Sequence, residues 1–432
     1  MMYPDEWPNN HILNTLLAKG SIALFGAHPW SVRLPNLLFF LLYAAAAYRI
    51  LRFILSEYSW FFIPFALLFI SNPYMFDFFG MCRGYGMSIA LSTFSASLFI
   101  TGILRMRTAH IWWGLALAIL ASYANFTLLL FWLAASVVAG FYFILRYSKT
   151  KEKPWIPFLI MVLGSLAYLA LIYTPIQKMQ STDQFTYWTS NGFFQDTVHP
   201  LIEMSGFQSG LTLPFTLVAY AGFLLILYSL LYSLNAWRKA KFQWSALAQP
   251  YTIAAVLLLG TAFVNILQTW IMGTPNLFGR TAMFFYPLYM ITILCTYPLV
   301  RTWILHKGLR LFLVLLICFF TSYHFLRATN PRIYREWYYD GNTYDVLALI
   351  HPEEAGKTVS LETNWLFNPS FQFHRECDHL TWLELRKYNK EINVETDADY
   401  YYVRLEDTVL LSGKYKVVTN WDNNFLMQRV IK

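Results

Sequence analysis

Residues 127–153 read TLLLFWLAASVVAGFYFILRYSKTKEK, in which nineteen uncharged residues run directly into a segment with four basic side chains. An α-helix needs about 20 apolar residues to cross the roughly 30 Å of hydrocarbon in a bilayer. Lysine and arginine beside such a helix are typical of its cytoplasmic end. The stretch therefore predicts a membrane-spanning helix over Thr127–Leu145, with its C-terminal end in the cytoplasm.

The same pattern recurs along the chain. Nine further apolar segments are Leu34–Leu51, Leu55–Ile70, Tyr85–Leu104, Ile111–Tyr123, Trp155–Thr174, Leu211–Leu234, Tyr251–Ile271, Thr281–Val300 and Leu311–Phe325. Every second gap is basic, and together these gaps hold Arg49, Arg52, Arg105, Arg107, Arg146, Lys149, Lys151, Lys153, Arg238, Lys239, Lys241, Arg301, Lys307 and Arg310. By the positive-inside rule these gaps are cytoplasmic, so the other gaps and both chain ends lie outside. The fold class is thus an all-α polytopic membrane protein with about ten transmembrane helices.

Composition supports this fold class, because 57% of the 432 residues are hydrophobic and only 13% are charged. The net charge of +8 is uneven: the last part of the chain, from Ala328, has 12 basic and 16 acidic residues. The excess of basic residues therefore belongs to the membrane part and reflects the orientation of its helices. Nucleic acid is not expected as a partner. The four cysteines show no CxxC pattern, so neither a disulfide framework nor a zinc site is predicted.

The C-terminal part, residues 328–432, changes character and predicts a small extracytoplasmic α/β domain next to the transmembrane domain of residues 1–327. Strands are expected at Lys357–Asn364, Asp399–Arg404 and Tyr415–Val418, and short helices at Asn342–Ile350 and Thr381–Tyr388. The types of three nearby residues, His374, Cys377 and His379, are those of metal ligands, but their spacing matches no standard zinc pattern. No metal site is therefore predicted.

Four polar segments fall on the outer side: Tyr3–Arg33, Asn72–Tyr85, Pro175–Gly210 and Met272–Arg280. The third contains an amphipathic piece, Phe193–Met204, that could lie flat on the membrane as a helix. This segment is interpreted either as a substrate-facing lid or as a plain connector.

Arg83 and Arg280 stand out in the outer segments, because each directly precedes a membrane helix on the side that disfavours positive charge. A cation at a helix start also opposes the helix dipole, which suggests an anionic partner. Two arginines from distant segments can converge on one phosphate as bidentate forks. Snorkelling to lipid headgroups is the alternative. Asp77 lies six residues before Arg83 and need not pair with it, since this spacing puts the two on different faces of a helix.

His11, in the sequence PNNH at residues 8–11, is a further candidate. An imidazole at the outer surface could donate a hydrogen bond or transfer a proton. A purely structural histidine in a polar loop is the alternative.

Several of these motifs together carry a family resemblance. They are PNNHILNTLL (8–17), RLPNLL (33–38), SNPY (71–74) with DFFGMCRGYG (77–86), and GRTAMFFYP (279–287). With this order and spacing, the chain resembles the polytopic lipid-dependent glycosyltransferases of the GT-C superfamily. The similar branch includes the dolichyl-phosphate-mannose protein mannosyltransferases and the bacterial aminoarabinose transferases.

The resemblance implies that a polyprenyl-phosphate sugar enters from the bilayer and that basic side chains hold its phosphate at the outer surface. A carboxylate then deprotonates the acceptor, and direct displacement inverts the anomeric carbon. Arg83 and Arg280 match the family's basic positions. Asn10 and His11 fall where relatives have a basic residue or histidine before two prolines, a pair that this sequence lacks. The substrate-binding residues expected on this basis are Asn10, His11, Arg83, Tyr85, Arg280 and Tyr286.

The catalytic aspartate of the family lies at the outer end of the first membrane helix. Here only eight residues precede the matching segment at Asn9, so that helix and its aspartate are expected upstream of Met1. Asp5 and Asp77 are the catalytic candidates within the chain. No cofactor is expected, with a divalent metal left open.

The function expected from the sequence is transfer of a sugar from a polyprenyl-phosphate donor to a glycan, lipid or protein acceptor. The location expected is the outer face of a bacterial inner membrane, with membrane lipid as a further partner. A transporter or flippase of lipid-linked saccharides is an alternative, although such proteins typically show inverted repeats and charges near the bilayer midplane. An inactive, lipid-binding relative is the other alternative.

Overall fold

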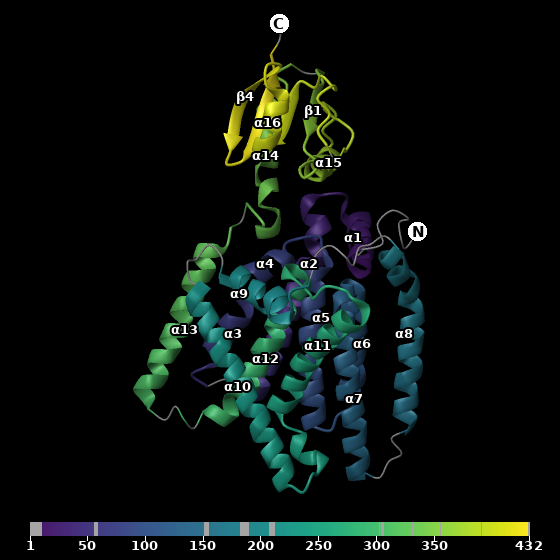
Figure 1. Cartoon of the computed structure of the whole chain (residues 1–432), viewed down its shortest axis with the longest axis vertical. Helices are drawn as coiled ribbons and strands as arrows, with labels where there is room; N and C mark the ends of the chain where they lie inside the picture. The colour runs from purple at the N-terminus through teal and green to yellow at the C-terminus, as the bar shows by residue number, and fades with distance from the viewer. Residues whose placement is uncertain are drawn as a thin grey trace. The chain divides into compact units, whose positions relative to one another are not determined.

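The computed structural model describes residues 11–55, 59–150, 155–181, 190–206, 212–301, 303, 306–330, 332–354, 356–389 and 391–430. The candidates Asp5 and Asn10 lie outside these ranges. The chain divides into two compact units, one comprising the residues up to Ser21 with Arg33–Thr329, the other Ile22–Val32 with the residues from Asn330 onward. Figure 1 shows that the first is helical and that the second contains a sheet.

Each of the ten apolar segments contains a helix. The helices of this region are α1 (Ile12–Phe25), α2 (Pro29–Ile54), α3 (Phe62–Ile70), α4 (Pro73–Phe79), α5 (Gly84–Leu104), α6 (Thr108–Ala124), η1 (Phe126–Leu128), α7 (Leu129–Thr150), α8 (Trp155–Ser181), η2 (Phe194–Val198), α9 (His199–Gly206), α10 (Thr212–Lys239), η3 (Trp244–Leu247), α11 (Pro250–Met272), η4 (Gly279–Ala282), α12 (Phe285–Val300) and α13 (Lys307–Ala328). Within the described ranges, eight are long and apolar enough to cross a membrane, or nine if α3 and α4 form one broken span. The chain is an integral membrane protein.

The segment Leu55–Ile70 differs most from the sequence prediction of a full span. Its helix α3 has only nine residues and is followed by a 58° bend into α4. The dipeptide Asn72-Pro73 explains the bend, since proline disfavours helical backbone in the residue before it. Asn72 instead caps α4, its side-chain oxygen accepting a hydrogen bond from the Met75 backbone N–H at 3.0 Å.

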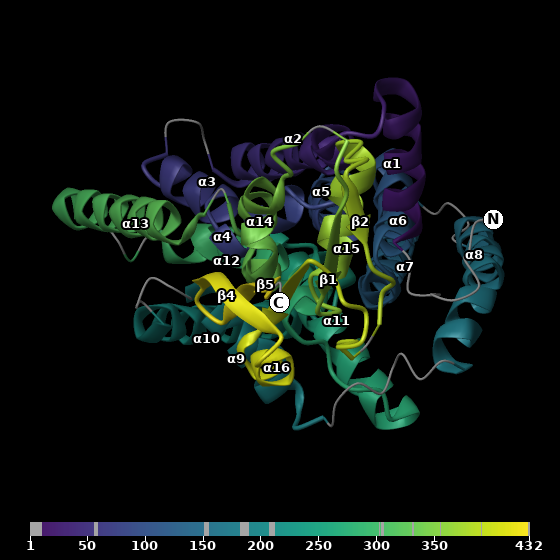
Figure 2. The same cartoon turned by 90° about the horizontal axis from the view of Figure 1, so that it is seen from above.

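Helix α5 is the centre of the membrane unit. In its most apolar stretch 89% of the residues are buried, against 6% for α13. Its many small residues allow neighbouring helices to approach closely, and the Ser95 hydroxyl donates to the Gly114 carbonyl of α6 at 2.7 Å. Figure 1 shows α5, α6 and α7 running side by side, and Figure 2 places α8 and α13 at the rim of this unit.

The second unit contains one five-stranded sheet. Its elements are η5 (Arg335–Asn342), α14 (Thr343–Ile350), β1 (Val359–Thr363), α15 (Asn368–Cys377), β2 (Leu383–Leu385), β3 (Tyr400–Arg404), α16 (Leu405–Leu411), β4 (Tyr415–Trp421) and β5 (Asn424–Arg429). The strand order is β2-β1-β3-β5-β4, in which β1 pairs in parallel with β2 and β3 while β5 is antiparallel to both β3 and β4. Strands β1, β3 and β4 and helix α14 confirm four of the predicted elements.

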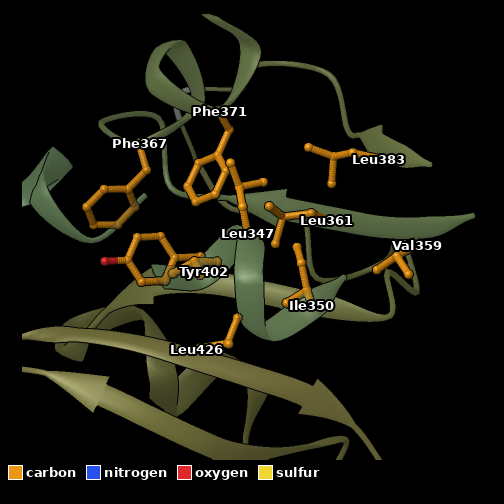
Figure 3. Close-up of a cluster of buried hydrophobic side chains, with 10 residues drawn as sticks. Leu347, Ile350, Val359, Leu361, Phe367, Phe371, Leu383, Tyr402 and Leu426 are labelled. Atoms are coloured by element: carbon orange, nitrogen blue, oxygen red, sulfur yellow. The ribbon is translucent and has the colours of Figure 1, made fainter. Parts of the chain in front are cut away.

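Both faces of the sheet are buried, because successive side chains of a strand point to opposite faces. On one face, Tyr402 joins a cluster in which its ring lies 4.5 Å from that of Phe367, as Figure 3 shows. On the other face, the neighbouring Tyr401 and Val403 pack with Leu411 of α16. The domain is thus an α/β unit with an apolar cluster on each side of its sheet.

The predicted helix Thr381–Tyr388 is wrong, because this segment forms β2. Its residues Leu383, Glu384 and Leu385 alternate between apolar and polar, which is the period of a strand. Leu383 pairs with Val359 of β1 and is buried in the core cluster. Pairing with a neighbouring strand therefore overrode the local helical tendency.

Candidate functional site

Four side chains singled out in the sequence lie together where α5 begins and α6 ends. The His11 ring lies 4.7 Å from the Tyr85 ring, edge to face. The Tyr85 hydroxyl accepts a hydrogen bond from Arg280 Nε at 3.2 Å. Arg83, the fourth, is the N-cap residue of α5. The site therefore joins three segments that are far apart in the sequence.

His11 is fixed in one orientation. Its Nδ1 lies 2.8 Å from the Ala124 carbonyl oxygen at the end of α6. A carbonyl only accepts, so Nδ1 carries the proton and, in the neutral ring, Nε2 keeps its lone pair. Burial, together with the positive charges of Arg83 and Arg280, lowers the pKa of His11 to about 4. Both guanidinium groups thus act on one neutral imidazole, which makes the site electropositive and suited to an anion.

The stability of the protein is expected to fall as the pH drops from about 6.5 toward 4. The folded state holds His11 neutral with a pKa of about 4, below the ordinary 6.5, so in this window the unfolded chain binds more protons. This loss of stability is absent above pH 6.5 and complete below pH 4. Thermal unfolding of the wild type should show a steeper loss between these pH values than that of His11→Gln, whose amide can still donate to Ala124. Parallel curves would contradict this assignment.

The segment that carries Arg83 is held by two asparagines within apolar helices. Asn36 of α2 donates to the Arg83 carbonyl at 2.5 Å and also to the Met81 carbonyl. Asn14 of α1 donates to Cys82 Sγ at 3.4 Å. Both asparagines belong to the quoted motifs, but neither was predicted to have a role. The available signal was an amide among apolar neighbours in a largely apolar helix, which must find hydrogen-bond partners if buried.

Gly84 allows the close approach on which this arrangement depends. A Cβ atom at this position would lie 1.8 Å from the Ala124 carbonyl oxygen and 2.9 Å from His11 Cβ. Only glycine lets the start of α5 lie against the end of α6 at this distance. The glycine after Arg83 is therefore explained by packing.

A buried carboxylate that the sequence analysis did not single out supports the loop bearing Arg280. Asp196, in the π-helical turn η2, accepts hydrogen bonds from Ser190 Oγ at 2.8 Å and Asn276 Nδ2 at 3.2 Å. The Asn191 backbone N–H donates to the same carboxylate at 3.0 Å. These bonds hold residues 190–198 against Asn276, which lies four residues before Arg280. Asp196 is thus a positioning residue, and the predicted helix Phe193–Met204 is confirmed by η2 and α9.

Two further candidates occupy other positions. Asp77 lies half-buried in α4, before the segment that carries Arg83. The Tyr286 hydroxyl, at the start of α12, donates to the Leu68 carbonyl of α3 at 2.5 Å. This bond holds α12 against α3, and a substrate-binding role for Tyr286 stays a prediction.

A cavity of about 630 Å³ lies elsewhere in the membrane unit, between α7, α8, η3 and α11. Its lining includes Val137, Phe158, Trp244 and Ile253 and contains no ionisable side chain. It suits an apolar chain and offers no acidic, basic or cationic side chain. In the C-terminal unit, His374 pairs with Asp378 at 3.0 Å. Within the described ranges no three His, Cys, Asp or Glu side chains are grouped to hold a metal.

Comparison with known proteins shows a likeness of fold. No protein-family model matches the chain, and no curated protein matches it by sequence. Among solved structures, the chain resembles the crystal structure of ArnT from Cupriavidus metallidurans in the apo state, with a TM-score of 0.53 and 12% identity. The match covers 97% of this chain and 87% of that one. The likeness concerns the fold, and it confirms the GT-C-like architecture indicated by the sequence motifs.

Proposed function

We propose that this chain is a membrane glycosyltransferase that moves a sugar from a polyprenyl-phosphate donor to an acceptor at the outer face of the membrane. The observation that carries the proposal is that Arg83 and Arg280 lie close enough for both positive charges to lower the pKa of His11. Arg280 also donates a hydrogen bond to the Tyr85 hydroxyl. The fold shared with ArnT supports the same reaction class. The likeness to ArnT concerns the fold, so the donor and acceptor proposed here rest on the residues of the site.

The proposed reaction is a single displacement. An acceptor hydroxyl oxygen attacks the anomeric carbon as the bond from that carbon to the phosphate oxygen breaks. The electron pair leaves with the polyprenyl phosphate, whose growing negative charge Arg83 and Arg280 stabilise. The hydroxyl proton passes to a carboxylate, for which Asp5 and Asp77 stay the candidates within the chain. No cofactor is required in this scheme, because the guanidinium groups neutralise the leaving group.

Local structure favours a phosphate at this position. The first turn of α5 presents backbone N–H groups and the positive end of the helix dipole, and its N-cap residue Arg83 provides no side-chain cap. Arginine suits this role because its planar fork binds two phosphate oxygens at once. His11 Nε2 can accept a hydrogen bond from a sugar or acceptor hydroxyl.

Turnover tests the proposal against its alternatives. Purified full-length chain in detergent is incubated with a polyprenyl-phosphate-linked aminoarabinose or mannose and a lipid or glycan acceptor, and released polyprenyl phosphate is measured. Release that depends on the acceptor supports transfer. Movement of the intact lipid-linked sugar across proteoliposomes, without cleavage, would instead establish a transporter. Binding without either activity would favour an inactive relative.

Orientation follows from the charge pattern and belongs to the same proposal. The fourteen basic residues of the inner gaps face five in the short outer segments: Lys19, Arg33, Arg83, Lys178 and Arg280. Alkaline phosphatase fused after Lys432, which is active only outside the cytoplasm, is therefore expected to be active in bacterial cells. Activity of β-galactosidase at the same position would place the C-terminal unit in the cytoplasm.

A further inference from the structure

A second basic cluster lies where α5 ends and α6 begins, at the opposite end of both helices from His11 and Arg83. Helix α5 has 21 residues, which at 1.5 Å per residue separates the two ends by about 30 Å. The cluster contains Arg49 of α2, Arg105 and Arg107 of the α5–α6 connection, and His110 of α6. The proposed glycosyl transfer uses none of them.

The cluster is organised around Arg49. Its Nη2 donates to Thr101 Oγ1 at 3.1 Å and lies 3.5 Å from His110 Nδ1. Because arginine only donates, Nδ1 of His110 is the acceptor and its Nε2–H is available as a donor. The guanidinium of Arg105 stacks on the Phe53 ring, 4.9 Å from its centroid. Within the described part of the chain, Arg49 and His110 therefore contact hydroxyl and ring nitrogen atoms and no carboxylate.

One donor of Arg49 is buried without a partner. Its Nε has no hydrogen bond within the described part of the chain. The positive charges of Arg105 and Arg107 also act on Arg49 and His110, so several like charges share a small volume. Unsatisfied donors and mutually repelling cations are both unfavourable, and an anion would relieve both.

The backbone conformation and the helix packing in this region bring these residues close together. Met106, between the two arginines, has φ 53°, in the left-handed region that non-glycine residues rarely adopt. A Cβ atom on Gly102 would lie 2.9 Å from His110 Cβ, so glycine is what lets the start of α6 approach α5. Arg146 of α7 donates to the Thr108 hydroxyl in the first turn of α6. Basic residues that only set topology extend into solvent and need none of these features.

We propose that this cluster binds a phosphate group at the cytoplasmic side of the membrane, carried by an anionic phospholipid headgroup or by free phosphate. Arg49 supplies its buried Nε–H, Arg107 the guanidinium of an exposed side chain, and His110 its Nε2–H. The first turn of α6, a helix of 17 residues, adds the positive end of its dipole. The location on the cytoplasmic side follows the orientation proposed above, but binding at the cluster does not depend on it.

Calorimetric titration of the purified full-length chain tests the proposal with two probes. One is inorganic phosphate, compared with chloride at equal ionic strength. The other is dioctanoyl phosphatidylglycerol, compared with dioctanoylglycerol, which lacks the phosphate. We expect at least one phosphate-bearing probe to bind, and Arg49→Gln and Arg107→Gln each to weaken it by about tenfold or more, as loss of a charge-assisted hydrogen bond implies. Arg238→Gln, which removes a charge from the last turn of α10, is the matched control.

The outcomes separate the sources of the phosphate. Binding of both probes indicates a pocket for the phosphate group itself, and binding of the lipid alone indicates a headgroup site in the inner leaflet. Unfolding midpoints of the variants show whether the fold is kept, and Arg107→Gln changes only an exposed side chain. Failure of both probes to bind would overturn the proposal. So would binding that is insensitive to Arg49→Gln and Arg107→Gln, since that would place the anion at the outer arginines.

Discussion

Alanine at Arg280 is expected to weaken binding of polyprenyl phosphate by about 10- to 150-fold, the loss that one charge-assisted hydrogen bond of ~1.5–3 kcal/mol implies. The Nε–H of Arg280 donates to the Tyr85 hydroxyl, which fixes the plane of the guanidinium. A fixed plane lets the terminal nitrogens meet two phosphate oxygens at once. Arg83→Ala should have an effect of similar size, and lysine at either position should restore only part of the affinity. Equilibrium binding of the labelled lipid to purified protein measures each value.

The controls for these variants separate the phosphate contact from general electrostatics. Lys19→Ala removes an exposed positive charge from α1, on the same proposed side of the membrane, and should leave the affinity nearly unchanged. Thermal unfolding of all variants shows whether the fold is intact. Unchanged affinity in both Arg83→Ala and Arg280→Ala, with intact folding, would exclude the phosphate role.

Alanine at Gly84 is expected to destabilise the protein by several kcal/mol or to prevent its folding. The added methyl would lie 1.8 Å from the Ala124 carbonyl oxygen and 2.8 Å from its carbonyl carbon. These are backbone atoms, so the two helix ends must separate, at more than the ~1–3 kcal/mol typical of a tight core. The same separation would break the bond from His11 to Ala124. The unfolding midpoint and the yield of folded protein measure the effect.

Gly164→Ala is the matched control, because a Cβ atom on Gly164 of α8 meets nothing within 4 Å. In a helix with open space, alanine in place of glycine is expected to stabilise by ~0.5–1 kcal/mol. The two substitutions are chemically identical and should therefore act in opposite directions. Similar effects at both positions would show that the close approach at Gly84 is not required.

Much of the architecture could be predicted from local sequence, because the bilayer imposes length and polarity on each helix. A common site for Arg83 and Arg280 could also be predicted, since both lie on the side that disfavours positive charge, and in the structure both act on His11; a shared anion stays a prediction. The end of α3 at Ile70 was predicted, but helix α4 was not, because Asn72–Tyr85 was assigned to a polar outer segment. Asp196 was missed because its role depends on Asn276, which is 80 residues away. Thr381–Tyr388 was assigned wrongly because pairing with β1 is not visible in local propensity.

The roles of Asn14 and Asn36 show the limit of such inference most clearly. Each is an asparagine in a largely apolar helix, and the sequence does not say what it contacts. In the structure both hold the segment that carries Arg83, and together they define where that arginine begins α5. Their importance follows from the burial of their amides, which must be hydrogen-bonded.

The central claim is that Arg83 and Arg280 recognise the phosphate of a polyprenyl-linked substrate. The most direct measurement compares the affinity of the purified chain for a polyprenyl phosphate with its affinity for the corresponding polyprenol. The two ligands share the apolar tail and differ only in the phosphate. We predict that the wild type prefers the phosphate strongly and that the Arg83→Ala/Arg280→Ala double variant binds both ligands alike. Equal affinity in the wild type, or a preference that persists in the double variant, would contradict the claim.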